Sequence, residues 1–301
     1  MSASLMAGSG DVVVISGCSS GFGLRAAVDL AVRGFRVVAT MRDLGKRARL
    51  DAAAAAAPGG PAAIEVEALD VTDAASIARC VEGVLARHGR IDGLVNNAGY
   101  GIGGFVHDLA LGEIRAQFET NFFGLVALTK AVLPSMIARR GGRIVNVASI
   151  AGRVALPGMA AYCASKFAVV GFSESLRHEL APLGIWVSVV EPGSFRTDIF
   201  DTNRRVAAGA ADPGSPFAET TRRMTGFVDR MVGRMPTDVT PVVRAIHRGL
   251  TARRPPLHML VGLDAKAQRA ARALLPERAF DAIVAWRVTG SGAKNGAKNG
   301  A

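Results

Sequence analysis

The sequence predicts an α/β fold, a single domain in which a mostly parallel, seven-stranded sheet is doubly wound, with helices on both faces. Three observations predict it. Short β-branched apolar runs alternate with helix-like runs along the chain. A glycine-rich turn joins the first apolar run to a helix. No linker-like segment interrupts the alternation, and a hydrophobic content of 50% in 301 residues is ample for one large core.

The expected strands are the seven runs that are short, apolar and rich in β-branched residues. They are residues 11–16, 35–40, 64–69, 91–95, 143–148, 185–191 and 257–261. Helices are expected at 24–32, 74–88, 113–139, 160–180 and 265–287, while 47–61 is a helix or a loop. Thr72 or Asp73 is expected to cap the helix at 74–88. Pro134 is expected to kink the helix at 113–139 or to mark its last turns, and Pro276 to break the last helix.

Three segments depart from this alternation. Residues 1–10 and 289–301 are expected to be a flexible N-terminus and a disordered tail, which leaves 11–288 as the folded domain. Residues 198–236 fit no sheet element and mix Gly and Pro with Phe and Met. So long an irregular segment after a strand's carboxyl end predicts a substrate lid, and packed accessory helices are compatible with the same residues.

The cysteines and the hydropathy of the chain indicate the cellular compartment in which the protein is expected. The three cysteines, Cys18, Cys80 and Cys163, lack a metal-like spacing, so we expect a reducing compartment, no structural disulfide and no metal site. We find neither a signal-peptide pattern nor a run of about 18 uncharged apolar residues. The sequence therefore predicts a cytoplasmic protein without a spanning helix.

The net charge of +11 is carried mostly by the C-terminal third. Residues 201–301 hold 17 Lys/Arg against 8 Asp/Glu, whereas residues 1–200 hold 19 against 17. Such a basic region could attract an anionic substrate or a membrane surface. We favour a solvated arginine face, because the arginines are scattered, no nucleic-acid motif accompanies them and stacking aromatics are scarce. No nucleic-acid partner is expected, and at most weak contact with a membrane surface.

The glycine-rich turn after the first strand has the spacing Gly-x-x-x-Gly-x-Gly, a variant of the dinucleotide-binding fingerprint. Its glycines allow a tight turn, and the following helix offers free N–H groups and the positive end of its dipole to a pyrophosphate. An ordinary glycine-rich turn is the alternative. The residues expected to contact a dinucleotide here are Gly17, Ser19, Ser20, Gly21, Phe22 and Gly23.

Tyr162 and Lys166 stand four residues apart in a predicted helix, so the phenol and the ammonium share one face. Ser149 lies upstream at the carboxyl end of a predicted strand, where open α/β sheets bind ligands. A lysine beside a phenol is expected to lower the phenol's pKa from about 10, so that it can exchange a proton with an alcohol oxygen. Taken alone, the pair also fits a surface tyrosine beside a solvated lysine.

Five motifs occur in the order and spacing of the short-chain dehydrogenase/reductase family, which the chain resembles over about residues 10–288. They are Ser16-Gly-Cys-Ser-Ser-Gly-Phe-Gly23, Asn96-Asn97-Ala98-Gly99, Ser149, Tyr162-x-x-x-Lys166 and Pro192-Gly193. Residues 38–44 and the glycine loop are most similar to the 17β-hydroxysteroid and retinol dehydrogenase branch. The resemblance implies a Rossmann-type fold, a nicotinamide cofactor and a homodimer or homotetramer. It also implies interconversion of a ketone or aldehyde with an alcohol on a hydrophobic, steroid-, retinoid- or lipid-like substrate.

The resemblance also implies roles for single residues. Tyr162 is expected to be the general acid or base, Lys166 to tune it and bind the nicotinamide ribose, and Ser149 to donate to the substrate oxygen. Asn121 matches an asparagine that holds a proton-relay water, although an asparagine in a helix usually faces solvent. Further cofactor contacts are expected from Asp70, Val71, Asn97, Ala98, Gly99, Pro192, Gly193 and Thr197. A plain helix cap is the alternative role for Asp70.

The charges after the second strand favour NADP(H) over NAD(H). An acidic residue about 20 residues past the glycines would bind the ribose hydroxyls and repel a 2′-phosphate. Met41 occupies that position, and Arg42, whose planar donors suit a phosphate, follows it. Asp43 is the dissenting residue, unless it points away or pairs with Arg42.

Two alternative functions remain open. The first is a catalytically silent NADP(H)-binding regulatory protein, against which the intact Ser149, Tyr162 and Lys166 count. The second is a membrane-surface, lipid-modifying reductase that uses its basic C-terminal helix as an anchor. Sedimentation with liposomes at low and high salt separates the second alternative from a freely diffusing enzyme.

Overall fold

A seven-stranded sheet in which every pairing is parallel forms the centre of the molecule, in the order β3-β2-β1-β4-β6-β7-β9. The computed structural model describes residues 10–59, 61–199 and 204–289. Most of the predicted N-terminus (1–9), the tail from 290, and four residues of the predicted lid (200–203) lie outside the described residues. The strands are β1 (Val12–Ile15), β2 (Arg36–Met41), β3 (Ile64–Ala68), β4 (Gly93–Asn96), β6 (Gly142–Val147), β7 (Ile185–Pro192) and β9 (His258–Val261).

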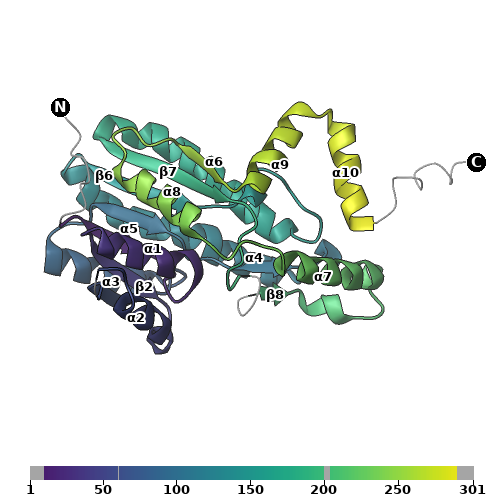
Figure 1. The fold of residues 1–301 in the computed structure, drawn as a ribbon, viewed down its shortest axis with the longest axis horizontal. Coiled ribbons are helices and arrows are strands. Elements are labelled where there is room, and N and C mark those ends of the chain that lie inside the picture. The colour runs from purple at the N-terminus through teal and green to yellow at the C-terminus, as the bar shows by residue number, and fades with distance from the viewer. Residues whose placement is uncertain (1–9, 60, 200–203, 290–301) are drawn as a thin grey trace, which may run out of the picture.

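Helices cover both faces of this sheet (Figure 1). One face is packed by α1 (Gly21–Val32), α2 (Ala48–Ala55) and α8 (Thr240–Thr251). The other is packed by α3 (Ala74–His88), α5 (Gly124–Ala138) and α6 (Ala160–Leu180). Strands buried on both faces must be apolar throughout, which is why β1 is an unbroken valine and isoleucine run. The predicted doubly wound fold is confirmed, and the strand order reverses between β1 and β4, where such sheets bind ligands.

The long helix expected at 113–139 is three consecutive helical segments. It consists of α4 (Leu111–Phe118), a π-helical turn η3 (Glu119–Phe123) and α5, in whose last turns Pro134 lies as predicted. By length and composition, the stretch Leu111–Ala138, which includes Lys130, could cross a membrane. Its inner side contributes Leu128, Val132 and Met136 to the sheet-facing core with no exposed surface, which is the packing of a core helix.

The segment predicted as a lid contains a strand, so the expectation that it fits no sheet element is wrong. β8 (Arg204–Val206) pairs in parallel with β5 (Gly101–Gly103), forming a small second sheet. The segment continues through η6 (Ala208–Ala211) into α7 (Ala218–Val232). A three-residue strand leaves too short a β-branched run to be recognised from the sequence.

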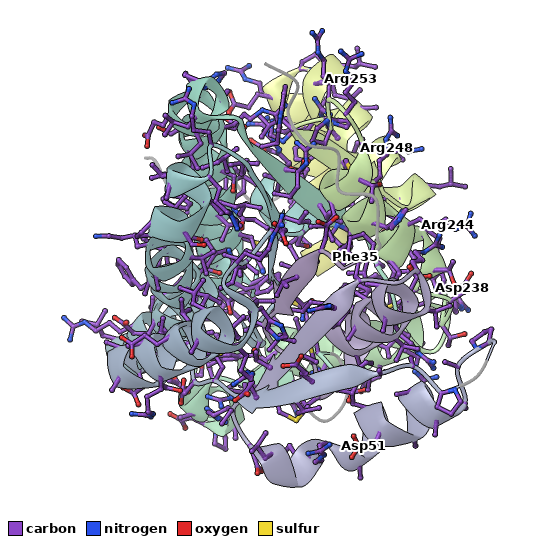
Figure 2. The ribbon with its side chains drawn as sticks, turned by 90° about the vertical axis from the view of Figure 1, so that its left-hand side faces the viewer. Phe35, Asp51, Asp238, Arg244, Arg248 and Arg253 are labelled. Atoms are coloured by element: carbon purple, nitrogen blue, oxygen red, sulfur yellow. The ribbon has the colours of Figure 1, made fainter. Side chains whose placement is uncertain are left out.

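The C-terminal end consists of α9 (Leu263–Leu274) and α10 (Glu277–Thr289), which break at Pro276 as predicted and extend beyond the sheet (Figure 1). Figure 2 shows Arg244, Arg248 and Arg253 along one outer side, directed away from the sheet, as a solvated arginine face requires. The remaining short helical turns are η1 (Leu44–Lys46), η2 (Val106–Asp108), η4 (Ile150–Gly152) and η5 (Ala181–Leu183).

Candidate active site

A cavity of about 1540 Å³ lies at the carboxyl edge of the sheet, where the loops after β1, β2, β3, β4, β6 and β7 meet under α7. Most of the residues predicted to bind cofactor or substrate line it. They are Gly17, Ser19, Ser20, Gly21, Phe22, Arg42, Asp70, Val71, Asn97, Ala98, Gly99, Ser149, Tyr162, Lys166, Pro192, Gly193 and Thr197. Gly23 and Asn121 lie behind this lining. The fold therefore gathers residues from seven sequence segments into one cavity.

Ser149 and Tyr162 both line the cavity, and the serine hydroxyl acts on the phenol. Ser149 follows β6 and begins η4, where its hydroxyl oxygen accepts the N–H of Ala151 at 3.1 Å. Tyr162 is buried in α6, and the nearby Ser149 hydroxyl lowers its pKa. Because the backbone occupies one lone pair, the serine proton is free to face the phenol or a substrate oxygen.

Burial has the largest effect on the pKa of Tyr162. It raises this pKa to about 12, and the neighbouring Ser149 hydroxyl opposes only part of that rise. The expected lowering of the pKa by Lys166 is therefore wrong. The reason is geometric, because the lysine ammonium lies 5.8 Å from the centre of the Tyr162 ring and donates instead to the Val147 carbonyl at 3.0 Å. Burial also lowers the pKa of Lys166 to about 8.

Asn121 is buried, contrary to the expectation for an asparagine in a helix. It lies in the π-helical turn η3, and its side chain is 1% exposed. Its amide oxygen accepts the N–H of Tyr100 at 3.0 Å, and its amide nitrogen donates to the Tyr100 carbonyl at 3.0 Å and to Ser165 at 3.1 Å. The wider turn directs the side chain inward, so that Asn121 fixes the backbone that follows Gly99.

The glycine loop presents an uncapped helix N-terminus to the cavity. Ser20, the N-cap residue of α1, makes no side-chain capping bond, and the first turn carries no acidic residue. Gly17 and Gly21 have φ values of +73° and +59°, which suit glycine. A Cβ at Gly23 would lie 2.4 Å from the Gly17 carbonyl oxygen, so only glycine allows α1 to start this close to β1. These free N–H groups fit a pyrophosphate.

Asn97 holds this loop in place. Its side-chain nitrogen donates to the carbonyls of Ser16 and Gly17 at 3.0 Å each, joining the end of β4 to the end of β1. The Ser16 hydroxyl accepts the N–H groups of Asn97 and Ala98, also at 3.0 Å each. Ser16 is the first residue of the glycine motif, and the motif alone does not predict this role for its hydroxyl. The side chain of Asn97 is thus a structural clamp as well as part of the lining.

The two charged residues after β2 behave differently. Arg42 is exposed and lines the cavity. The Asp43 carboxylate caps η1 by accepting the N–H of Gly45 at 2.9 Å. Asp70 accepts both the N–H and the hydroxyl of Thr72, at 2.9 and 2.7 Å, so it closes a turn, while Asp73 caps α3. Asp70 therefore does not cap a helix, which was the alternative role for it. It stabilises the turn before α3 instead.

The segment after β7 is fixed by a residue that sequence reasoning missed. Asp264, in the first turn of α9, accepts the N–H of Ser194 at 2.6 Å, and a Cβ at Gly193 would collide with it. Thr197 lies against the glycine loop, with its Cβ 3.6 Å from the Cβ position of Gly21. Asp264 stands about 70 residues beyond the motif that it supports, and no local pattern marks it.

One part of the cavity wall is mostly apolar and comes from α7. It presents Met224, Phe227, Val228 and Met231 to the cavity. The Met224 methyl group lies 2.8 Å from the Cβ position of Gly158, so α7 packs closely over the loop that precedes α6. Methionine side chains fill irregular space and adapt to different apolar shapes.

A family model described as short chain dehydrogenase matches residues 11–207. This chain belongs to the short-chain dehydrogenase family. Human retinol dehydrogenase 8 is 41% identical over 84% of this chain and 81% of its own length. Human 17-beta-hydroxysteroid dehydrogenase type 1 is 42% identical over 62% of this chain and 57% of its own. The resemblance to this branch is confirmed, and the chain is an oxidoreductase.

Solved structures agree with the fold. A short-chain dehydrogenase from Streptomyces avermitilis is 33% identical, with a TM-score of 0.77 over 93% of this chain and 96% of its own. One from Burkholderia phymatum, in complex with NAD, is 28% identical, with a TM-score of 0.75 over 89% and 95%. A metagenomic short-chain oxidoreductase in complex with NADP is 40% identical, with a TM-score of 0.57 over 62% and 84%. Members of this family thus bind either nicotinamide dinucleotide.

Proposed function

We propose that this short-chain dehydrogenase uses NADP(H) to interconvert a ketone or aldehyde with an alcohol on a hydrophobic, steroid-, retinoid- or lipid-like substrate. One observation carries the proposal: Ser149 and Tyr162 line the same cavity as the apolar side chains of α7. The names of retinol dehydrogenase 8 and 17-beta-hydroxysteroid dehydrogenase type 1 point to substrates of the same character.

The protein's own groups handle the proton. When bound, the nicotinamide supplies the hydride in reduction and accepts it in oxidation. In reduction Tyr162 gives its phenol proton to the carbonyl oxygen, while Ser149 donates a hydrogen bond that stabilises the charge growing there. A phenol whose pKa is about 12 keeps its proton at neutral pH, which suits an acid. Lys166, held by the Val147 carbonyl, keeps a positive charge near the phenolate that forms.

The preference for NADP(H) rests on the charges at the end of β2. Arg42 and Lys46 line the cavity there, and either side chain suits a 2′-phosphate. Asp43, the residue that would favour NAD(H), also lines the cavity, but one of its carboxylate oxygens accepts the N–H of Gly45 as the cap of η1. Segment 198–236, whose α7 covers the cavity, is proposed as the substrate lid. The expected homodimer or homotetramer stays a prediction.

The test is steady-state turnover with both cofactors. Purified protein is assayed for NADPH and NADH oxidation with steroid ketones, retinaldehyde, long-chain ketones and small ketones. We expect kcat/KM to be higher for NADPH and to rise with the apolar area of the substrate. A preference for NADH, or for small polar ketones, would contradict the proposal.

A second candidate, weak attachment of this reductase to a membrane surface, is favoured by one observation. Leu263 and Leu274 of α9 are 85% and 81% exposed and lie eleven residues apart, three helical turns, on the same side. Lys266, Arg269 and Arg272 on the same helix would suit anionic lipids. Sedimentation with anionic vesicles tests this contact, which should weaken with salt and in a Leu274→Ser variant. If the protein stays out of the vesicle pellet at both low and high salt, the membrane contact is excluded.

A further inference from the structure

Two neighbouring arginines on β8 line the cavity, and they are in different electrostatic situations. Arg204 forms an ion pair with Asp229 of α7, with 2.7 Å between Nη1 and Oδ1. The guanidinium of Arg205 lies over the ring of Tyr100, with Cζ 4.2 Å from the ring centre. Within the described part of the chain, no carboxylate pairs with Arg205. Among the described residues, one of the two charges is therefore paired with a carboxylate and the other is not.

Arg205 is held in a defined place relative to the reacting centre. The pairing of β5 with β8 sets Arg205 opposite Ile102, and Tyr100 precedes this strand. Gln117 donates to the Tyr100 carbonyl at 2.7 Å, and Asn121 bonds both its N–H and its carbonyl. The following residue, Gly101, lies near the Tyr162 ring, because a Cβ at Gly101 would lie 3.5 Å from it. Arg205 therefore lies over the residue that directly precedes the backbone beside Tyr162.

An apolar substrate alone would leave this cation uncompensated. Arg205 is exposed, so a substrate that fills the cavity covers only part of its guanidinium. The part of the charge that loses water without gaining a partner costs free energy. The apolar wall also contains Thr221, whose hydroxyl is buried and has no hydrogen-bond partner within the described residues. The cavity therefore combines the apolar surface of α7 with a cation that has no carboxylate partner and a hydroxyl that has no hydrogen-bond partner among the described residues.

We infer that the substrate is an amphiphile whose anionic group, a carboxylate or a phosphate, pairs with Arg205 while its apolar chain packs against α7. This inference rests on the proposed carbonyl–alcohol chemistry. With one face of the guanidinium over the Tyr100 ring, its edge is left to bind an anion through two parallel N–H donors. The reacting carbon and the anion then lie in one cavity, so the class is oxo or hydroxy acids, or the corresponding phosphates, with an apolar chain.

The experiment compares substrates that differ only in charge. Medium-chain oxo acids with the ketone at different distances from the carboxylate are assayed beside their methyl esters and the matching oxo-alkyl phosphates. The proteins are wild type, Arg205→Gln, Arg205→Lys and, as a control, Arg222→Gln, which removes an exposed arginine of α7 that does not line the cavity. Calorimetric binding of the same acid and ester to the NADPH-bound protein is measured in parallel.

We expect the anion to raise kcat/KM about 5- to 20-fold over the ester, the lower part of the range for a charge-assisted bond at a partly exposed site. Arg205→Gln should remove this advantage and leave kcat/KM for the ester within about 2-fold of the wild-type value. Arg205→Lys should keep part of the advantage, and Arg222→Gln should keep all of it. The phosphate arm shows which anion is preferred. Equal values for acid and ester in wild type, or an acid advantage that survives Arg205→Gln, would overturn the inference.

The two proposals fail in different ways. If the esters are reduced and the acids gain nothing, the proposed function stands and the anionic class is wrong. If no carbonyl compound is reduced but the acid binds more tightly than the ester through Arg205, the site binds an anion and the proposed reaction is wrong.

Discussion

The ammonium of Lys166 and the carbonyl of Val147 form a buried hydrogen bond of 3.0 Å, which ties the tyrosine helix α6 to the last residue of β6. The same strand leads directly into Ser149, so one strand end positions both the serine and the lysine. The lysine is 5% exposed and its pKa is lowered to about 8 by burial. Keeping a positive charge at this place therefore opposes folding.

Lys166→Met should make the protein more stable and inactive. At pH 7 the unfolded lysine has a pKa near 10.5 and the folded one a pKa of about 8, so charging the folded lysine costs about 3 kcal/mol at 1.36 kcal/mol per unit. Leaving the Val147 carbonyl without its donor offsets about 1–2 kcal/mol. Urea unfolding at pH 7 should show a net gain of about 1–2 kcal/mol.

The pH dependence of that gain gives its control. Between pH 8 and pH 10.5 the unfolded chain holds a proton on Lys166 that the folded chain has released, so wild-type stability contributed by this group rises with pH. The advantage of the Met variant must shrink over this window and be largest below pH 8. An advantage that does not change from pH 7 to pH 9.5 would show that the lysine is not a buried charge.

Gly23→Ala should damage both stability and cofactor binding. The new Cβ would lie 2.4 Å from the Gly17 carbonyl oxygen and 2.5 Å from the Asn97 amide nitrogen, so the phosphate loop must shift. Overpacking of this kind costs about 1–3 kcal/mol, and we expect NADPH affinity to fall by roughly tenfold or more. Fluorescence titration with NADPH and thermal unfolding measure the two effects.

Gly112→Ala is the matched control, because a Cβ there meets nothing within 4 Å. It should leave NADPH binding unchanged and cause no loss of stability, since alanine favours a helix. If both glycine variants behave alike, the close approach of the glycine loop does not matter for cofactor binding.

Arg42→Ala tests the choice of cofactor. A guanidinium that binds a 2′-phosphate in an open cleft should contribute roughly tenfold in NADPH affinity, while NADH, which lacks the phosphate, should be little affected. Arg42→Asp should reverse the preference. Met41 occupies the position of the acidic residue that would bind the ribose hydroxyls, but it is unsuitable for this substitution because it is 2% exposed and packs in the core. The ratio of kcat/KM for the two cofactors decides, and a wild-type ratio below one would mean an NAD enzyme.

Local patterns predicted the elements well. The helices 74–88 and 160–180 begin and end where the sequence placed them, and each predicted strand overlaps an observed one. The reason is that buried parallel strands and sheet-covering helices carry strong, short-range apolar patterns. The glycine loop and the Tyr162–Lys166 pair could be found for the same reason, since each is contiguous in sequence.

Features that depend on contacts between distant segments could not be predicted. The π-helical turn that buries Asn121, the clamp of Asp264 on Ser194 and the placement of Arg205 over Tyr100 leave no periodic signal. A buried amide chain is another example. Asn96 donates to Thr129 and Asn146 at 2.9 Å each, and Asn146 donates to Ser173 at 2.8 Å, joining β4 and β6 to α5 and α6. The spacing of Tyr162 and Lys166 predicts a lowered pKa for the phenol, whereas burial raises it. Spacing indicates which residues are neighbours but not how deeply they are buried.

The most direct test of the proposed chemistry is Tyr162→Phe, assayed for NADPH-dependent carbonyl reduction and titrated with NADPH by fluorescence. The ring stays in its buried place while the proton donor is lost, so cofactor affinity should be nearly unchanged and kcat should fall by roughly 100-fold or more. A variant that keeps more than about a tenth of the wild-type rate would contradict the assignment of Tyr162 as the acid.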